Sequence, residues 1–197
     1  MKFSHREKKD LFFAGLMISL AFAILLSGGY RALFSSNLSF IFIFAAAFFT
    51  AGLGFLLHEI MHKHIAQSYG LKAEFQAFYP MLWLAIVFSF FGFIFAAPGA
   101  VMIQSFRPLS KEKNGKISIA GPGTNIILAI IFLILLLVFG NQSAILGYGL
   151  TINSLLAAFN MIPAMPFDGA KILAWNKGIY TITLLVAIGL FVASFIL

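Results

Sequence analysis

Long apolar stretches without charged residues alternate with short charged connections along this chain. About 20 apolar residues are enough to cross the hydrocarbon core of a membrane as a helix. By this criterion the sequence predicts five spanning helices, at residues 11–29, 39–69, 117–139, 144–163 and 178–197. The third and fourth helices are separated by Gly140-Asn141-Gln142, which we expect to form a hairpin connection.

The apolar segment between the second and third predicted spans is harder to interpret. It is interrupted by Pro80 and by Pro98-Gly99, and its many phenylalanines suit an extended strand as well as a helix, so periodicity does not decide. We expect a re-entrant or strand-like hairpin over residues 72–103. Such backbone is tolerated at membrane depth only where protein or a wet cavity satisfies its amides.

The distribution of basic residues supports a hairpin over a sixth span. If residues 72–103 enter and leave on one side, every Lys and Arg except Arg31 lies on the same side as the N-terminus. Basic residues accumulate in cytoplasmic connections. We therefore expect a multi-pass protein of the cell membrane, with a cytoplasmic N-terminus and an outward C-terminus.

Composition agrees with this interpretation. The chain has 197 residues, of which 61% are hydrophobic and 10% charged, and its mean hydropathy is +1.01. A soluble fold of this size has too little interior to bury so much apolar surface. We expect an all-α polytopic membrane protein that forms a single domain over residues 1–197. The net charge of +7 does not indicate nucleic-acid binding, because the basic residues are scattered over short connections.

The chemistry of the chain centres on a His-Glu-x-x-His pattern at residues 58–62. On a helix, His58 and His62 project from one face, so both imidazoles can bind one tetrahedral zinc ion. Glu59 is rotated by about 100° from that face, which suits a general base beside the metal. The alternative is two interfacial histidines at a helix end. It is disfavoured because Glu59, after some twenty uncharged residues, would be costly if unpaired.

A zinc site needs a third ligand, and with no cysteine in the chain it must come from His or a carboxylate. Asp168 follows two prolines, Pro163 and Pro166, which break the helix and let the chain bend back. Gly169 permits a tight turn beside the carboxylate. The alternative is an interfacial Asp that caps the next helix. We expect Asp168 to complete a site for one Zn²⁺ per chain.

Two asparagines are candidates for substrate contacts near this site. A buried amide of Asn125 or Asn160 could donate to the oxyanion or anchor the substrate backbone. The alternative for each is an interhelical hydrogen bond that only supports packing. The sequence leaves both interpretations open.

Three motifs in combination resemble the site-two protease family of intramembrane zinc metalloproteases. They are His-Glu-x-x-His at 58–62, Gly-Pro-Gly-Thr-Asn at 121–125, and Asn-x-x-Pro at 160–163 followed by Asp168-Gly169. The resemblance covers residues 39–173. One departure is Phe167, where the family often has leucine before Asp-Gly.

This resemblance implies both activity and site residues. It implies zinc ligands at His58, His62 and Asp168, a catalytic Glu59, and a substrate that is a membrane-spanning segment of another protein. The strand-rich insert of the family would fall on residues 72–102. Two other functions remain: a metal-ion transporter, although the sequence shows neither a repeat nor a second metal cluster, and a catalytically silent scaffold, against which the intact Glu59 argues. We expect partners to be membrane lipid and a transmembrane protein or peptide.

Overall fold

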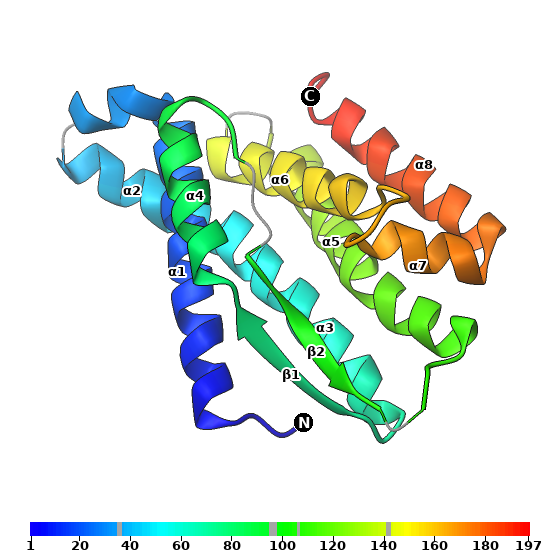
Figure 1. The fold of residues 1–197 in the computed structure, drawn as a ribbon. Coiled ribbons are helices and arrows are strands. Elements are labelled where there is room, and N and C mark those ends of the chain that lie inside the picture. Colours follow the sequence, from blue (N-terminus) through cyan, green and yellow to red (C-terminus); the bar gives the residue numbers. More distant parts are fainter. Residues whose placement is uncertain (35–36, 95–97, 106, 141–142) are drawn as a thin grey trace. The chain divides into compact units, whose positions relative to one another are not determined.

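The computed structural model shows a mostly helical chain with one small sheet (Figure 1). It describes residues 1–34, 37–94, 98–105, 107–140 and 143–197. The chain divides into two compact units. We call residues 57–73 and 103–197 the C-terminal unit, and residues 2–56 and 74–102 the N-terminal unit.

Helices alone build nearly all of the C-terminal unit. It contains most of α3 (Leu53–Ser68), then α5 (Lys111–Phe139), α6 (Ala144–Asn160), α7 (Asp168–Trp175) and α8 (Lys177–Ala193). Helix α5 packs against α6 and α7, and α8 packs against α6 and α7. A Cβ atom built on Gly149 would lie 2.4 Å from the Phe132 ring. A glycine on α6 therefore permits its close contact with α5.

The N-terminal unit combines helices with the sheet. Its elements are α1 (His5–Leu26), a 3₁₀ turn at Gly29–Phe34, α2 (Asn37–Ala47), a π-helical turn at Phe48–Gly52, α4 (Tyr79–Phe90), and most of β1 (Lys72–Ala77) and β2 (Gly99–Gln104). Helix α1 packs against α2 and α4. Small side chains allow this approach, since Ala21 and Ala85 are fully buried in the cluster they share with Ile24 and Ile86.

Strands β1 and β2 pair with each other in opposite directions (Figure 1). Successive N–H groups of a strand point to opposite sides, so one set bonds the partner strand and the other needs acceptors elsewhere. Helix α1 supplies them. The Phe75 N–H donates to Glu7 Oε1 at 2.9 Å, and the Ala77 N–H donates to Asp10 Oδ2 at 3.3 Å. The acids of α1 thus cover one edge of the sheet.

Within the described residues, three helical segments are long and apolar enough to cross a membrane: His5–Leu26, Ser39–Ser68 and Lys111–Phe139. They correspond to the first three predicted spans. The fourth and fifth predicted spans form α6 and α8, which are apolar but only 17 residues long each. The membrane character is therefore supported, while the five-span arrangement stays a prediction.

Large apolar side chains face outward along these helices. More than 60% of the residue surface is exposed at Phe42, Trp83, Val138, Ile182 and Leu185. Soluble proteins rarely expose apolar patches of this extent. A surface of this kind fits the expectation of a membrane protein.

The predicted hairpin over residues 72–103 differs from the structure in its middle. Strands β1 and β2 are present, but the 12-residue helix α4 lies between them. Pro80 occupies the first turn of α4, where a missing N–H costs nothing and the fixed φ favours the helix. Pro80, which interrupts the apolar segment in the sequence, therefore lies in the first turn of a helix. Residues 95–97 lie outside the described residues.

The predicted connection at Gly140-Asn141-Gln142 can be compared only in part. Helix α5 ends at Phe139, and Gly140 has a φ of 87°, a conformation that favours glycine. Residues 141–142 lie outside the described residues. At its other end α5 begins at Lys111, six residues before the predicted span, because Ser110 caps it by accepting from the Lys113 N–H.

Candidate metal centre

Helix α3 presents the two histidines of the His-Glu-x-x-His pattern on one face. His58 and His62 are one helical turn apart, and their ring centroids are 4.6 Å apart. Both are buried, with 4% and 7% of their surface exposed. Both belong to the C-terminal unit, so the geometry below lies within that one unit.

Asp168 reaches the histidines because the chain turns sharply after α6. Helix α6 ends at Asn160, and α7 begins at Asp168 after a connection that contains Pro163 and Pro166. A Cβ atom on Gly169 would lie 2.3 Å from the Met161 carbonyl oxygen. Gly169 therefore acts through the close approach of two backbone segments rather than through an unusual turn conformation.

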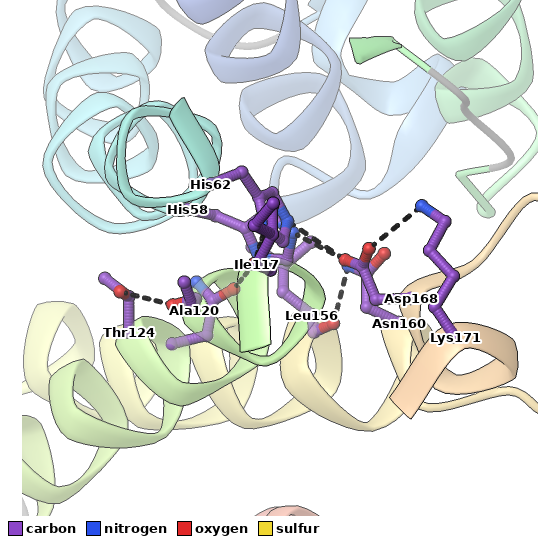
Figure 2. Close-up of polar contacts among 10 residues, drawn as sticks. His58, His62, Ile117, Ala120, Thr124, Leu156, Asn160, Asp168 and Lys171 are labelled. Atoms are coloured by element: carbon purple, nitrogen blue, oxygen red, sulfur yellow. Dashed lines mark hydrogen bonds and ion pairs between the residues drawn. The ribbon is translucent and has the colours of Figure 1, made fainter. Parts of the chain in front are cut away.

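The three predicted ligands converge (Figure 2). Asp168 Oδ2 lies 3.0 Å from His62 Nε2 and 3.5 Å from His58 Nε2. One ligand atom from each residue lies within 4.8 Å of the other two. Tetrahedral zinc with bonds of 2.0–2.2 Å holds its ligand atoms about 3.3 Å apart. The spacing of the cluster therefore fits zinc.

The protonation of the cluster also favours a cation. His62 Nδ1 lies 2.8 Å from the Ile117 carbonyl oxygen, which can only accept, so Nδ1 carries a proton, and in the neutral ring the lone pair is on Nε2. Burial raises the pKa of the Asp168 carboxyl, but His62 and His58 outweigh burial and hold that pKa well below its usual range. A lone pair and an ionised carboxylate at 3.0 Å need a proton or a metal between them.

Gly121 on α5 leaves the space beside both imidazoles open. A Cβ atom built on it would lie 2.3 Å from His62 Nε2 and 2.4 Å from His58 Nε2. Two residues further on, a Cβ atom on Gly123 would meet no atom within 4 Å. Gly121 is therefore required by the histidines, whereas Gly123 is not required by packing inside the chain.

The two candidate asparagines take different positions. Asn125 is fully buried, and its Oδ1 lies 2.6 Å from His58 Nδ1, so it contacts a ligand of the proposed metal. Asn160 donates its side-chain amide to the Leu156 carbonyl of its own helix at 3.0 Å. A contact of either asparagine with an oxyanion stays a prediction.

Glu59 is buried with 8% of its surface exposed, and it follows His58 directly on α3. In the part of the chain that the structure describes, the cluster with metal-ligand spacing comprises His58, His62 and Asp168 without Glu59. The catalytic role of Glu59 stays a prediction. Lys171 lies 3.4 Å from Asp168 Oδ1, the oxygen that does not approach the histidines (Figure 2).

Sequence reasoning missed two groups around the site. Asn153 on α6 is fully buried and accepts a hydrogen bond from Asn125 Nδ2 at 3.1 Å. An amide within an otherwise apolar helix was a usable signal for it. The Ile117 carbonyl that orients His62 had no sequence signal, because any residue type supplies a carbonyl.

Comparison with known proteins identifies the family. Over 192 residues the chain is 42% identical to "Putative zinc metalloprotease MJ0611" of Methanocaldococcus jannaschii, a match that covers 95% of this chain and 94% of that protein. The chain belongs to this family of zinc metalloproteases. It is also 34% identical over 134 residues to "Zinc metalloprotease MJ0392" of the same organism, which covers 66% of the chain and 33% of that longer protein.

No family model matches the chain, and no solved structure matches it. Membership of this metalloprotease family nevertheless implies zinc, and His58, His62 and Asp168 form the candidate site for it. Two imidazoles and one carboxylate would supply three ligands to a zinc ion, the number that catalytic zinc sites take from the protein.

Proposed function

We propose that this metalloprotease is an intramembrane protease of the site-two type, which hydrolyses peptide bonds in or near membrane-spanning segments of other proteins. The observation that carries the proposal is the buried convergence of His58, His62 and Asp168 in a chain whose relatives are named zinc metalloproteases. The motifs shared with the site-two protease family point to the same activity.

The elements that carry the cluster support a location within the membrane. Both histidines lie on the apolar segment Ser39–Ser68, and Gly121 and Asn125 lie on the apolar helix Lys111–Phe139. We propose that α6 and α8 are two further spans of a multi-pass protein of the cell membrane. The N-terminus is then cytoplasmic, and the metal centre lies near the cytoplasmic side, close to the basic residues that follow it.

The reaction we infer is hydrolysis of an amide, with His58, His62 and Asp168 as the residues that would hold the metal. A zinc ion bound there would supply a Lewis acid for the scissile carbonyl and lower the pKa of water from 15.7 to about 7. As the oxygen of the attacking water bonds to the carbonyl carbon, Glu59 takes the proton that this water gives up. Glu59 then gives that proton to the leaving nitrogen as the C–N bond breaks.

Membrane-spanning substrates impose a further requirement on the site. A helical substrate keeps its carbonyl groups in intrahelical hydrogen bonds, so it must unwind locally before attack. We propose that Asn160, at the end of α6, anchors the unwound backbone or stabilises the oxyanion. Asn125 contacts His58, so we assign the substrate contact to Asn160 first and to Asn125 second.

The activity can be tested on the full chain purified in detergent. It should be incubated with a panel of membrane-spanning peptides, with and without a zinc chelator. We expect cleavage that the chelator abolishes and added zinc restores. If zinc-loaded protein cuts no peptide but carries zinc across a liposome membrane, the protein is a transporter. If it does neither, it is a silent scaffold.

The proposed topology can be tested with single cysteines, because the chain has none of its own. Glu112→Cys, at an exposed position at the start of α5, should be labelled from the cytoplasmic side. Tyr30→Cys, which is 59% exposed between α1 and α2, should be labelled only from outside. Labelling of both from the same side would contradict the topology.

A further inference from the structure

A chain of buried amides connects the first zinc ligand to the backbone of α6. Asn125 on α5 and Asn153 on α6 are both fully buried. Asn153 Nδ2 donates to the Gly149 carbonyl at 2.9 Å, and Asn125 Nδ2 donates to Asn153 Oδ1 at 3.1 Å. Asn125 Oδ1 lies 2.6 Å from His58 Nδ1. We call this the Asn relay.

The Gly149 carbonyl, at the end of the Asn relay away from His58, determines which group donates in each of its hydrogen bonds. A main-chain carbonyl only accepts, so Asn153 must turn its NH₂ toward Gly149 and its oxygen toward Asn125. Asn125 must then turn its NH₂ toward Asn153 and its oxygen toward His58. An amide oxygen also only accepts, so His58 Nδ1 must carry a proton. A neutral His58 therefore has its lone pair on Nε2, the atom 3.5 Å from Asp168 Oδ2.

We propose that Asn125 and Asn153 are positioning residues that fix the Nδ1–H tautomer of His58 and so direct its Nε2 lone pair toward the metal. The inference rests on the metal site of the proposed function. Partners of this kind behind a metal-binding histidine fix its tautomer and ring orientation. Neither asparagine needs to touch the substrate for this role.

The two histidines obtain the same tautomer by different means. His62 uses the Ile117 carbonyl, which cannot exchange donor for acceptor. His58 uses the carboxamide of Asn125. This group would present its NH₂ donor to His58 if it were rotated by about 180°. The second asparagine removes that freedom, because an inverted Asn125 would bring two carbonyl oxygens together at Asn153. The close packing of α5 and α6 at Gly149 and Phe132 keeps the two asparagines within bonding distance.

A direct test reads the tautomer instead of activity. The full chain, labelled with ¹⁵N-histidine and free of metal, is studied by NMR at about pH 9, above the ordinary imidazole pKa of about 6.5. Asn153→Leu should shift His58 from the Nδ1–H tautomer toward a mixture. The His62 signal should not change, because its partner is a carbonyl. If His58 keeps its tautomer in Asn153→Leu, the proposal is wrong.

Zinc affinity, measured by competition with a chelator, gives a second readout. Loss of a partner behind a ligand typically costs about 10- to 100-fold in metal affinity, and we expect a loss in this range for Asn125→Leu and a smaller one for Asn153→Leu. Asn153→Asp keeps an acceptor for Asn125, so it should retain the wild-type tautomer of His58, although it loses the NH₂ group that donates to the Gly149 carbonyl. A tautomer mixture in Asn153→Asp like that in Asn153→Leu would contradict the relay.

Ser154→Ala is the matched control. Ser154 is as buried as Asn153 and adjacent to it, but its hydroxyl bonds the Leu150 and Thr151 carbonyls of its own helix. It should bind zinc as the wild type does. If Asn153→Leu does not fold, Asn153→Ala removes the same carboxamide without added bulk, with the same expected result. Absence of zinc binding in the wild type would refute the proposed function, whereas wild-type binding in both Asn153→Leu and Asn125→Leu would refute only the relay.

Discussion

Both units bury carboxylates, but they surround them with opposite chemistry. In the C-terminal unit Asp168 is 8% exposed and faces two imidazole nitrogens. In the N-terminal unit Glu7 is 1% exposed and Asp10 is 6% exposed, and they accept hydrogen bonds from the N–H groups of Phe75 and Ala77. Tyr79 also donates to Asp10, at 2.8 Å.

The difference shows that burial of a charge does not identify a functional site. Glu7 and Asp10 have backbone and hydroxyl donors, so their charge is compensated by the fold itself. Asp168 faces His62 Nε2, which in the neutral ring carries a lone pair because Nδ1 bonds a carbonyl. A proton or a metal ion must then lie between these two acceptors. The partners of a buried acid therefore separate a carboxylate satisfied by the fold from a candidate metal ligand.

Removal of the buried acids should produce the largest difference between the two units. Asp168→Ala leaves two protein ligands, which hold zinc weakly, so zinc content should fall well below one ion per chain and peptide cleavage should disappear. Asp10→Ala should keep one zinc ion per chain and lower only the unfolding temperature. Elemental analysis of both purified variants provides the measurement. Full zinc content in Asp168→Ala would remove Asp168 from the ligand set.

Gly121 and Gly123, both on α5, should respond differently to substitution by alanine. Gly121→Ala places a methyl group against both Nε2 atoms, and overpacking of about 1–3 kcal/mol corresponds to about a 5- to 150-fold loss of zinc affinity. Gly123→Ala, which meets open space, should bind zinc like the wild type. Chelator competition measures both variants. Equal affinities would show that Gly121 does not adjoin the site.

Substitution of Glu7 in the N-terminal unit should lower stability and leave zinc binding unchanged. Glu7→Ala leaves the Phe75 N–H without this acceptor, and a buried unsatisfied group costs about 1–3 kcal/mol of folding free energy. Its unfolding temperature should fall, with zinc content unchanged. Glu112→Ala, at an exposed Glu–Lys pair on α5, should leave the unfolding temperature at the wild-type value. Thermal unfolding of the two variants in detergent tests this difference, and equal unfolding temperatures would argue that Glu7 does not stabilise the sheet.

Local helix geometry explains why the metal cluster could be predicted from the sequence. The spacing of His58 and His62 fixes their common face on any helix, and the absence of cysteine restricted the third ligand to a few residues. The apolar helices His5–Leu26, Ser39–Ser68 and Lys111–Phe139 were predictable because their length and composition are local properties. The structure places Asp168 beside the histidines, so the three residues form a possible metal site, and their role as zinc ligands stays a prediction.

Features that depend on distant contacts escaped prediction. The sequence assigns no role to Glu7 and Asp10, because only the position of β1 shows that they accept its N–H groups. Helix α4 was ambiguous because Pro80 fits a break or a first helical turn equally well. Asn153 is a polar residue in a mostly apolar stretch, but its bond to Asn125 depends on the contact between α5 and α6.

The central claim is that Glu59 acts on the proton of the attacking water at a zinc site that it does not itself form. Zinc content and peptide cleavage should therefore be measured in parallel on the wild type and Glu59→Gln. The glutamine cannot accept the proton, and loss of a general base typically costs about 10² to 10⁴ in rate. We expect zinc to be retained at one ion per chain and cleavage to be lost. A Glu59→Gln variant that cuts at the wild-type rate would contradict the account.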